Sequence, residues 1–130
     1  MKRSLSVAWA AALLISVLMG TIPAFAGEAR WVVTADGTAP MAPVSEVAAR
    51  APYLLVFDAQ GVFLEAIENP AVRFEHRAGP ALAELLEELR VEVLIAGEIG
   101  RNLATALEDK NIRSVLASGA AAQAVKEALR

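Results

Sequence analysis

Short apolar runs alternate with helical repeats along the chain from residue 31 onward. Val, Leu, Ile and Phe dominate five segments that are short enough to be strands, at residues 31–33, 53–57, 62–67, 91–96 and 112–116. The run at 53–57 is continuous, which predicts a strand covered on both faces. Glu65 interrupts the apolar pattern of 62–67, which fits a sheet edge protected by charge.

Three segments carry apolar residues at helical spacing. The clearest is a stripe that follows Gly79-Pro80, where proline suits the first turn of a helix; its members are Leu82, Leu85, Leu86 and Leu89. Residues 100–110 form a second helix with Leu103 and Leu107 inward, closed by Asn111. Residues 119–129 form a third, with Val125 and Leu129 inward, and residues 44–50 form a short helix. The element order β-β-β-α-β-α-β-α predicts a three-layer α/β domain with a mixed sheet.

The first 26 residues have the three parts of a secretory signal. Lys2 and Arg3 form the charged start, residues 5–19 are apolar except for two serines, and Ala24-Phe25-Ala26 is a small-x-small cleavage pattern. We therefore expect an exported, periplasmic protein that begins at Gly27, with residues 27–130 as one domain and the export signal as its one link to a membrane. An uncleaved membrane anchor is the alternative.

Composition excludes several classes of function. The chain has no Cys, so it forms neither disulfides nor thiolate metal sites. Cleavage removes Lys2 and Arg3 but none of the 15 acidic residues, so the mature chain is more acidic than the formal charge of −3. This argues against nucleic acid as a partner. Neither a phosphate-binding loop nor a nucleophile motif is present, and we expect a protein that is not an enzyme.

Several short motifs together resemble the dinitrogenase iron–molybdenum cofactor biosynthesis family, the NifX-like domains. The resemblance covers about residues 31–129 and rests on the order and spacing of its landmarks: Thr34-Ala35-Asp36-Gly37, Val44-Ser45, Arg50-Ala51-Pro52-Tyr53, Phe57-Asp58, Glu68-Asn69-Pro70, Ala78-Gly79 and Ala96-Gly97-Glu98-Ile99-Gly100. It implies a ribonuclease H-like α/β fold. It also implies a binding role toward iron–molybdenum cofactor or its precursor clusters, so an iron–sulfur or iron–molybdenum type cluster is the implied cofactor.

Two features depart from that family. Its members often read Val-Ser-Pro-His-Phe-Gly-Arg-Ala before the second strand, and the position of the histidine is Val47 here. A plausible cluster ligand is therefore missing. Family members also generally work in the cytoplasm, whereas this chain begins with an export signal.

The glycine turn at residues 97–100 is the first candidate binding site. It joins a buried strand to a helix, so free backbone N–H groups and the positive end of a helix dipole gather there. Gly97 would let a ligand approach the backbone, Gly100 opens the helix, and Arg101 adds a positive charge. The alternative is an ordinary strand–helix connection that needs glycine for its torsions.

Acidic residues after the strands are the second candidate. Asp36, beside Gly37, and Glu98 each follow a predicted strand, and they would converge on a hard cation if those strands are parallel neighbours. Asp58 ends a different strand and is expected at the opposite end of the sheet. Turn chemistry explains Asp36 and Asp58 equally well.

His76 is a weak third candidate, as a metal ligand. It is the one histidine of the chain and lies between Glu75 and Arg77 in a polar stretch, residues 72–78. Metals such as zinc and iron take three or four strong ligands, and neither a second His nor a Cys is available. A solvated loop histidine is the simpler interpretation.

The sequence therefore favours an exported α/β module that binds a small anionic ligand or a metallocofactor, with its site on the loops after the first and fourth strands. The alternative is a periplasmic protein–protein interaction or regulatory domain that needs no cofactor. A metal-dependent hydrolase is the weakest of the three hypotheses.

Overall fold

The computed structural model describes residues 30–130. It contains five strands, three α-helices and two 3₁₀ helices, in the order β1 (Arg30–Ala35), η1 (Ala48–Arg50), β2 (Tyr53–Asp58), β3 (Phe63–Glu68), η2 (Pro70–Arg73), α3 (Ala78–Glu88), β4 (Val91–Ala96), α4 (Arg101–Asp109), β5 (Arg113–Leu116) and α5 (Ala121–Ala128). The predicted mixed α/β architecture is confirmed. The predicted export signal at residues 1–26 lies outside the described residues.

The strands form one mixed sheet in the order β3-β2-β1-β4-β5. The first three strands of the chain form an antiparallel meander, in which β1 pairs with β2 and β2 with β3. The last two continue the sheet in parallel, because β4 lies beside β1 and β5 beside β4. The carboxyl ends of β1 and β4 therefore meet at the same edge of the sheet, where ligands of α/β proteins often bind.

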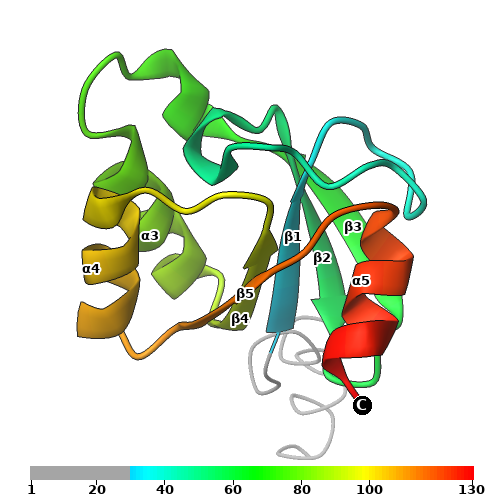
Figure 1. The fold of residues 1–130 in the computed structure, drawn as a ribbon. Coiled ribbons are helices and arrows are strands. Elements are labelled where there is room, and N and C mark those ends of the chain that lie inside the picture. Colours follow the sequence, from blue (N-terminus) through cyan, green and yellow to red (C-terminus); the bar gives the residue numbers. More distant parts are fainter. Residues whose placement is uncertain (1–29) are drawn as a thin grey trace, which may run out of the picture.

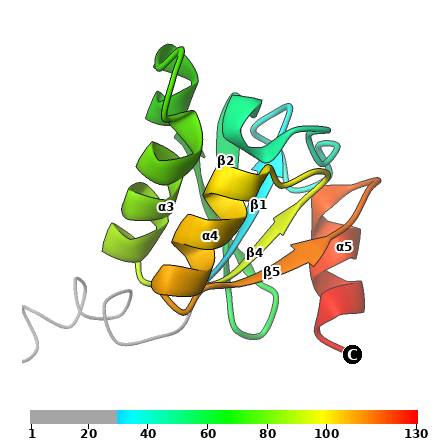
Figure 2. The same ribbon diagram turned by 60° about the vertical axis from the view of Figure 1, so that its left-hand side comes forward.

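Helices cover both faces of the sheet, as Figures 1 and 2 show: α3 and α4 lie side by side on one face, and α5 lies on the other. The core is divided accordingly. Leu82 and Leu86 of α3 pack with Leu103 and Leu107 of α4 against one face. Val125 of α5 belongs to the cluster on the other face. The strands of the sheet centre are thus buried on both sides, which explains their nearly continuous apolar sequence.

Two stretches differ from the expected elements. The short helix expected at residues 44–50 is only the 3₁₀ turn η1, and part of the expected polar loop at 72–78 belongs to η2. The second turn forms because the buried Asn69 caps it, accepting a hydrogen bond from the Ala71 N–H at 3.0 Å, and because Pro70 suits the first position. Leu129, expected to point inward from the last helix, lies just beyond α5 and is 37% exposed.

The edge position expected for Glu65 is confirmed. This side chain is exposed on β3, which is an edge strand of the sheet.

None of the helices in residues 30–130 is long and apolar enough to cross a membrane.

Candidate functional site

The loops after β1 and β4 lie next to each other, since the two strands are parallel neighbours. A segment that follows the first loop, residues 43–48, closes over the end of β4. It is held there by hydrogen bonds from the Ser45 N–H to the Thr34 carbonyl at 2.9 Å and from the Ala48 N–H to the Glu98 carbonyl at 2.9 Å. The predicted site residues thus share one end of the molecule, but this segment lies between them.

The acidic residues do not form the candidate cation site. Asp36 accepts a hydrogen bond from the Ser45 hydroxyl at 2.5 Å. Asp58 lies at the opposite end of the sheet, opposite Arg30, and accepts the Gln60 and Val62 N–H groups of the β2–β3 turn. Within residues 30–130, no group of three or more His, Cys, Asp or Glu side chains is placed to hold a metal ion. Asp36 and Asp58 therefore act in local turn chemistry.

Gly97 corrects a second expectation, because protein and not ligand occupies the space beside it. A Cβ built on Gly97 would collide with the carbonyl oxygen of Ser45 and would lie 2.8 Å from that of Glu46. The Gly97 N–H donates to the same Ser45 carbonyl at 3.1 Å. Glycine is needed here for the close approach of the segment 43–48, and the Gly97 N–H is not available to a ligand.

Gly100, in contrast to Gly97, has open space where a side chain would lie. Its φ of −69° is ordinary for any residue, and a Cβ added to it would meet nothing within 4 Å. It is the N-cap of α4, a position where Ser, Asp or Asn would stabilise the helix by capping it. Neither torsion nor packing therefore requires glycine here, so the alternative of a connection that needs glycine for its torsions does not explain Gly100.

The first turn of α4 presents free N–H groups and a positive charge. No side chain caps the helix and its first turn contains no acidic residue. The N–H groups of Arg101 and Asn102 have no acceptor among the described residues. Arg101 is exposed and is not part of an ion pair within residues 30–130. The first turn of α4 thus carries partial positive charge that no acidic residue of that turn offsets.

The first turn of α3 lies against that of α4 and has the same character. It too lacks a side-chain cap and acidic residues, and its N-cap residue, Arg77, has a left-handed backbone with φ of 67°. Gly79 allows the contact, because a Cβ there would lie 3.0 Å from the Leu103 nitrogen. Two helices therefore begin side by side, and their dipoles point the same way.

A groove of about 490 Å³ lies over these two helix starts. We call it the α3–α4 groove; it is lined by Val47, Ala49, Gly79 and residues 100–103. Gly100 and Arg101, predicted from the sequence as ligand-binding residues, lie in its wall. Asp36, Gly37, Gly97 and Glu98 do not line it, although the Glu98 carbonyl holds η1 beside it. Val47, the position at which the resemblance led us to expect a histidine, is 40% exposed in the same wall.

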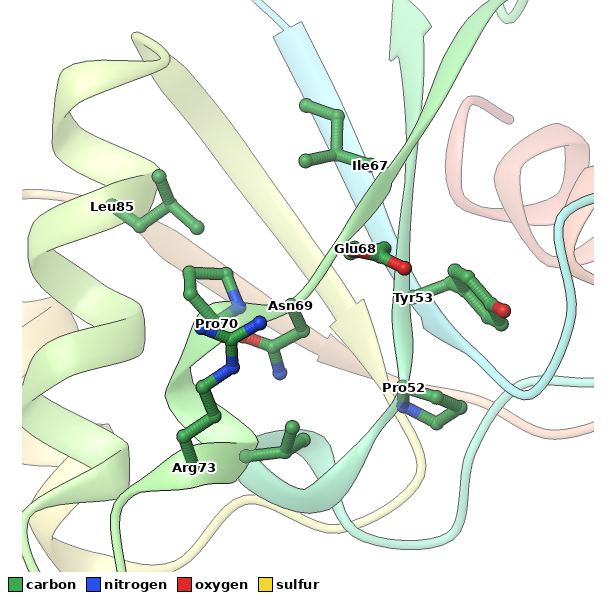
Figure 3. A pocket seen from close by; sticks show the side chains of 9 residues that line it. Pro52, Tyr53, Ile67, Glu68, Asn69, Pro70, Arg73 and Leu85 are labelled. Atoms are coloured by element: carbon green, nitrogen blue, oxygen red, sulfur yellow. The ribbon is translucent and has the colours of Figure 1, made fainter.

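A second cleft lies on the other side of α3, over the end of β3 (Figure 3). It measures about 410 Å³, and Leu85 of α3, Ile67 of β3 and Arg73 of η2 contribute to its walls, with Tyr53 at its far side. Local sequence patterns do not reveal this cleft, since its residues come from four separate elements, although two family landmarks, Pro52-Tyr53 and residues 68–70, lie in its wall. None of the predicted site residues lines it.

His76 lies apart from both. It is exposed and lines a recess of about 180 Å³ with Phe74, Arg77, Ala81 and Glu84. No cluster of metal-ligating side chains forms around it within the described part of the chain. Of the three candidates, the glycine turn is therefore the one that opens onto a groove.

The family model for the dinitrogenase iron–molybdenum cofactor matches residues 30–130. The chain belongs to this family. The match spans the whole described domain, so the resemblance seen in the short motifs is confirmed.

Solved structures with the same fold agree with this assignment. The apo form of the orange protein from Desulfovibrio gigas is 28% identical, with a TM-score of 0.72 over 78% of this chain and 88% of that one. A candidate NifB protein from Thermotoga, placed in the DUF35 family, is also 28% identical, with a TM-score of 0.64 over 75% of this chain and 84% of that one. No curated protein matches the sequence.

The residues of the α3–α4 groove do not fit a cluster that is bound through protein thiolates or imidazoles. Its walls carry neither sulfur nor imidazole nor carboxylate, and the chain has no Cys. Iron–sulfur clusters are held by such ligands. What the groove offers instead is backbone N–H groups, the guanidinium of Arg101 and the side-chain amide of Asn102.

Proposed function

We propose that this protein is an exported binding module that takes a small anionic group, related to the metallocofactors of its family, in the α3–α4 groove. The observation that carries the proposal is the pair of helix starts beneath the groove. Both lack a side-chain cap and both lack acidic residues in the first turn. An anion placed there would accept hydrogen bonds from free N–H groups and would interact favourably with two helix dipoles.

Gly100 supports the same assignment. Natural sequences place Ser, Thr, Asp or Asn at N-cap positions because their side chains bond the free N–H groups of the first turn. Glycine at this position, with open space where a side chain would lie, leaves those N–H groups accessible. Glycine costs the helix only about a few tenths of a kcal/mol relative to Ser or Asn, and it gives a ligand access to the first turn of α4.

Three further assignments belong to this proposal. The sheet order, with three antiparallel strands followed by two parallel ones, supports the ribonuclease H-like fold that the family resemblance implies. The charged, apolar and small-residue parts of residues 1–26 support export to the periplasm. A binding role without catalysis is supported by the family, whose model is named for a cofactor, and by the lack of a nucleophile motif in the sequence.

A matched pair of variants tests the site. Gly100→Asp and Gly100→Asn have nearly the same shape and both cap α4, but only the first adds a negative charge. The probe is tetrathiomolybdate, an anion of molybdenum and sulfur, and binding to the purified protein is measured by equilibrium dialysis without oxygen at low ionic strength. We expect the wild-type protein to bind, and Gly100→Asp to bind at least tenfold more weakly than Gly100→Asn.

Circular dichroism must show the native fold in both variants before the comparison counts. Binding by both variants that equals that of the wild-type protein would place the anion elsewhere. If the wild-type protein does not bind the anion at all, the alternative function, an interaction domain without cofactor, takes precedence. One observation favours that alternative: Val72 and Phe74 are exposed apolar residues near the start of α3, and Phe74 is 50% exposed.

A further inference from the structure

The outer side of β3 is an open edge of the sheet, because β3 stands first in the strand order and has no second partner strand among residues 30–130. The Asn69 N–H donates to the Pro52 carbonyl at 3.0 Å, on the side of β2. Antiparallel strands alternate between residues that bond a neighbour and residues that point both backbone groups the other way. By this alternation, Ala66 and Glu68 direct their N–H and C=O groups away from β2, at the open edge.

The cleft of Figure 3 lies beside this edge. Leu85 of α3 and Ile67 of β3 contribute to its walls, and both side chains are only half-buried. A strand added along β3 would place the residue opposite Ile67 on the same face of the sheet, toward α3. The cleft, of about 410 Å³, has room for a large apolar side chain at that position. An open edge with a pocket beside it provides what peptide recognition by strand addition requires.

Charges at the edge restrict what can be added there. Glu65 and Glu68 are exposed on β3, and neither belongs to an ion pair within the described part of the chain. A second copy that paired through its own β3 would bring these carboxylates together, and like charges on paired strands are destabilising. The same carboxylates favour Lys or Arg on the added strand. Arg73, exposed and also without an ion pair within residues 30–130, lines the cleft and favours a carboxylate beside it.

We propose that the edge of β3 and its cleft bind an extended basic segment of another protein, which adds antiparallel to β3. Opposite residues 69 to 65, in that order, the segment reads acidic, basic, large apolar, any residue, basic. The basic residues face Glu68 and Glu65, the apolar residue enters the cleft beside Ile67, and the acidic residue faces Arg73. This site goes beyond the proposed function, since its cleft shares no residue with the α3–α4 groove.

A peptide with blocked ends, Thr-Glu-Lys-Leu-Thr-Lys-Thr, has this pattern and tests the register. In the proposed pairing the N–H of the threonine after leucine points at β3, opposite Ala66, whereas the leucine N–H points away from β3. N-methylation at leucine should therefore change the affinity by no more than about threefold, and N-methylation at that threonine should weaken it by about tenfold or more. Fluorescence anisotropy of labelled peptides, added to the purified protein, measures both.

A matched pair of protein variants tests the charge of the edge. Glu65→Lys reverses an exposed charge on β3, and Glu92→Lys makes the same change at an exposed position of β4, which is separated from β3 by two strands. We expect Glu65→Lys to bind the unmodified peptide about fivefold or more weakly than Glu92→Lys does. Circular dichroism should show the same native fold in both variants.

Three results would overturn the proposal: no binding of the peptide by the wild-type protein, equal weakening by the two N-methyl groups, or equal affinity of the two variants. Amide resonances add a fourth criterion. Addition of the peptide should shift those of Ala66 and Glu68, and shifts confined to the α3–α4 groove would also contradict the proposal. All of these measurements are made without an anion, so their failure leaves the test of the proposed function unaffected.

Discussion

Gly97 and Gly100 lie three residues apart but differ in whether a side chain would fit. At Gly97 the space of a Cβ is filled by backbone carbonyls of residues 45 and 46, whereas at Gly100 that space is open. The sequence alone presents both as one glycine turn. The distinction depends on residues 43–48, which are distant in the sequence, so it becomes visible only when the fold brings that segment over the end of β4.

This difference predicts unequal effects of the same substitution. Gly97→Ala forces the segment 43–48 away from β4 and should lower the free energy of unfolding by about 1–3 kcal/mol, as overpacked sites do. Gly100→Asn should change it by no more than about 0.5 kcal/mol and in the stabilising direction, because asparagine caps a helix slightly better than glycine. Chemical denaturation of the two variants measures both values. Similar losses of stability would mean that Gly100 also has a packing role.

Glu98 gives a second prediction at this scale. It is exposed two residues before Gly100, the N-cap of α4, and it is the acidic residue of the loop that leads into that helix. Its negative charge opposes an anion in the α3–α4 groove. Glu98→Gln should therefore tighten the binding of tetrathiomolybdate roughly two- to fivefold, the range expected for an exposed charge. Weaker binding by this variant would indicate that the carboxylate itself contacts the ligand or a metal.

At the scale of elements, α3 and α4 were the parts most readily predicted. The leucines of α3 recur at helical spacing along the element, and Leu82 and Leu86 are completely buried in the structure. The short elements η1 and η2 were not predicted as such. Their geometry depends on Asn69, whose side-chain amide donates to the Ala51 carbonyl at 2.9 Å, a contact across 18 residues that no local pattern reveals.

Stability measurements can check the phase of α3. Leu86→Ala should lower the free energy of unfolding by about 2–5 kcal/mol, because it opens a cavity beneath a side chain with 0% exposure. Glu88→Ala, on the exposed side of the same helix, should change it by no more than about 0.5 kcal/mol. Equal effects would show that the helix is rotated about its axis relative to this description.

At the scale of the whole molecule, the sequence predicted the architecture better than the site. The alternation of strands and helices was sufficient for a mixed α/β domain, because apolar periodicity records which faces are buried. It correctly placed Gly100 and Arg101 at a helix start. It did not reveal that Ala49 and Gly79 share a groove with them, since η1, α3 and α4 meet only through the folding of the sheet.

Export is the prediction that concerns the chain as a whole. If residues 1–26 are a cleaved signal, N-terminal sequencing of the protein from the periplasmic fraction should begin at Gly27. A reporter enzyme that works only outside the cytoplasm should be active when it is fused to this protein. Protein that is found in the cytoplasm and retains Met1 would contradict the export assignment without affecting the groove.

The most direct test of the central claim is an NMR titration in which the backbone amide resonances are followed as an anion is added. Isotope-labelled protein is titrated with tetrathiomolybdate, and the shift of every backbone N–H is recorded. The account predicts the largest shifts at Arg101, Asn102, Ala78 and Gly79, the first turns of α4 and α3, and small shifts around His76 and Tyr53. The largest shifts at the cleft of Figure 3 or at the recess of His76, with none at the two helix starts, would contradict it.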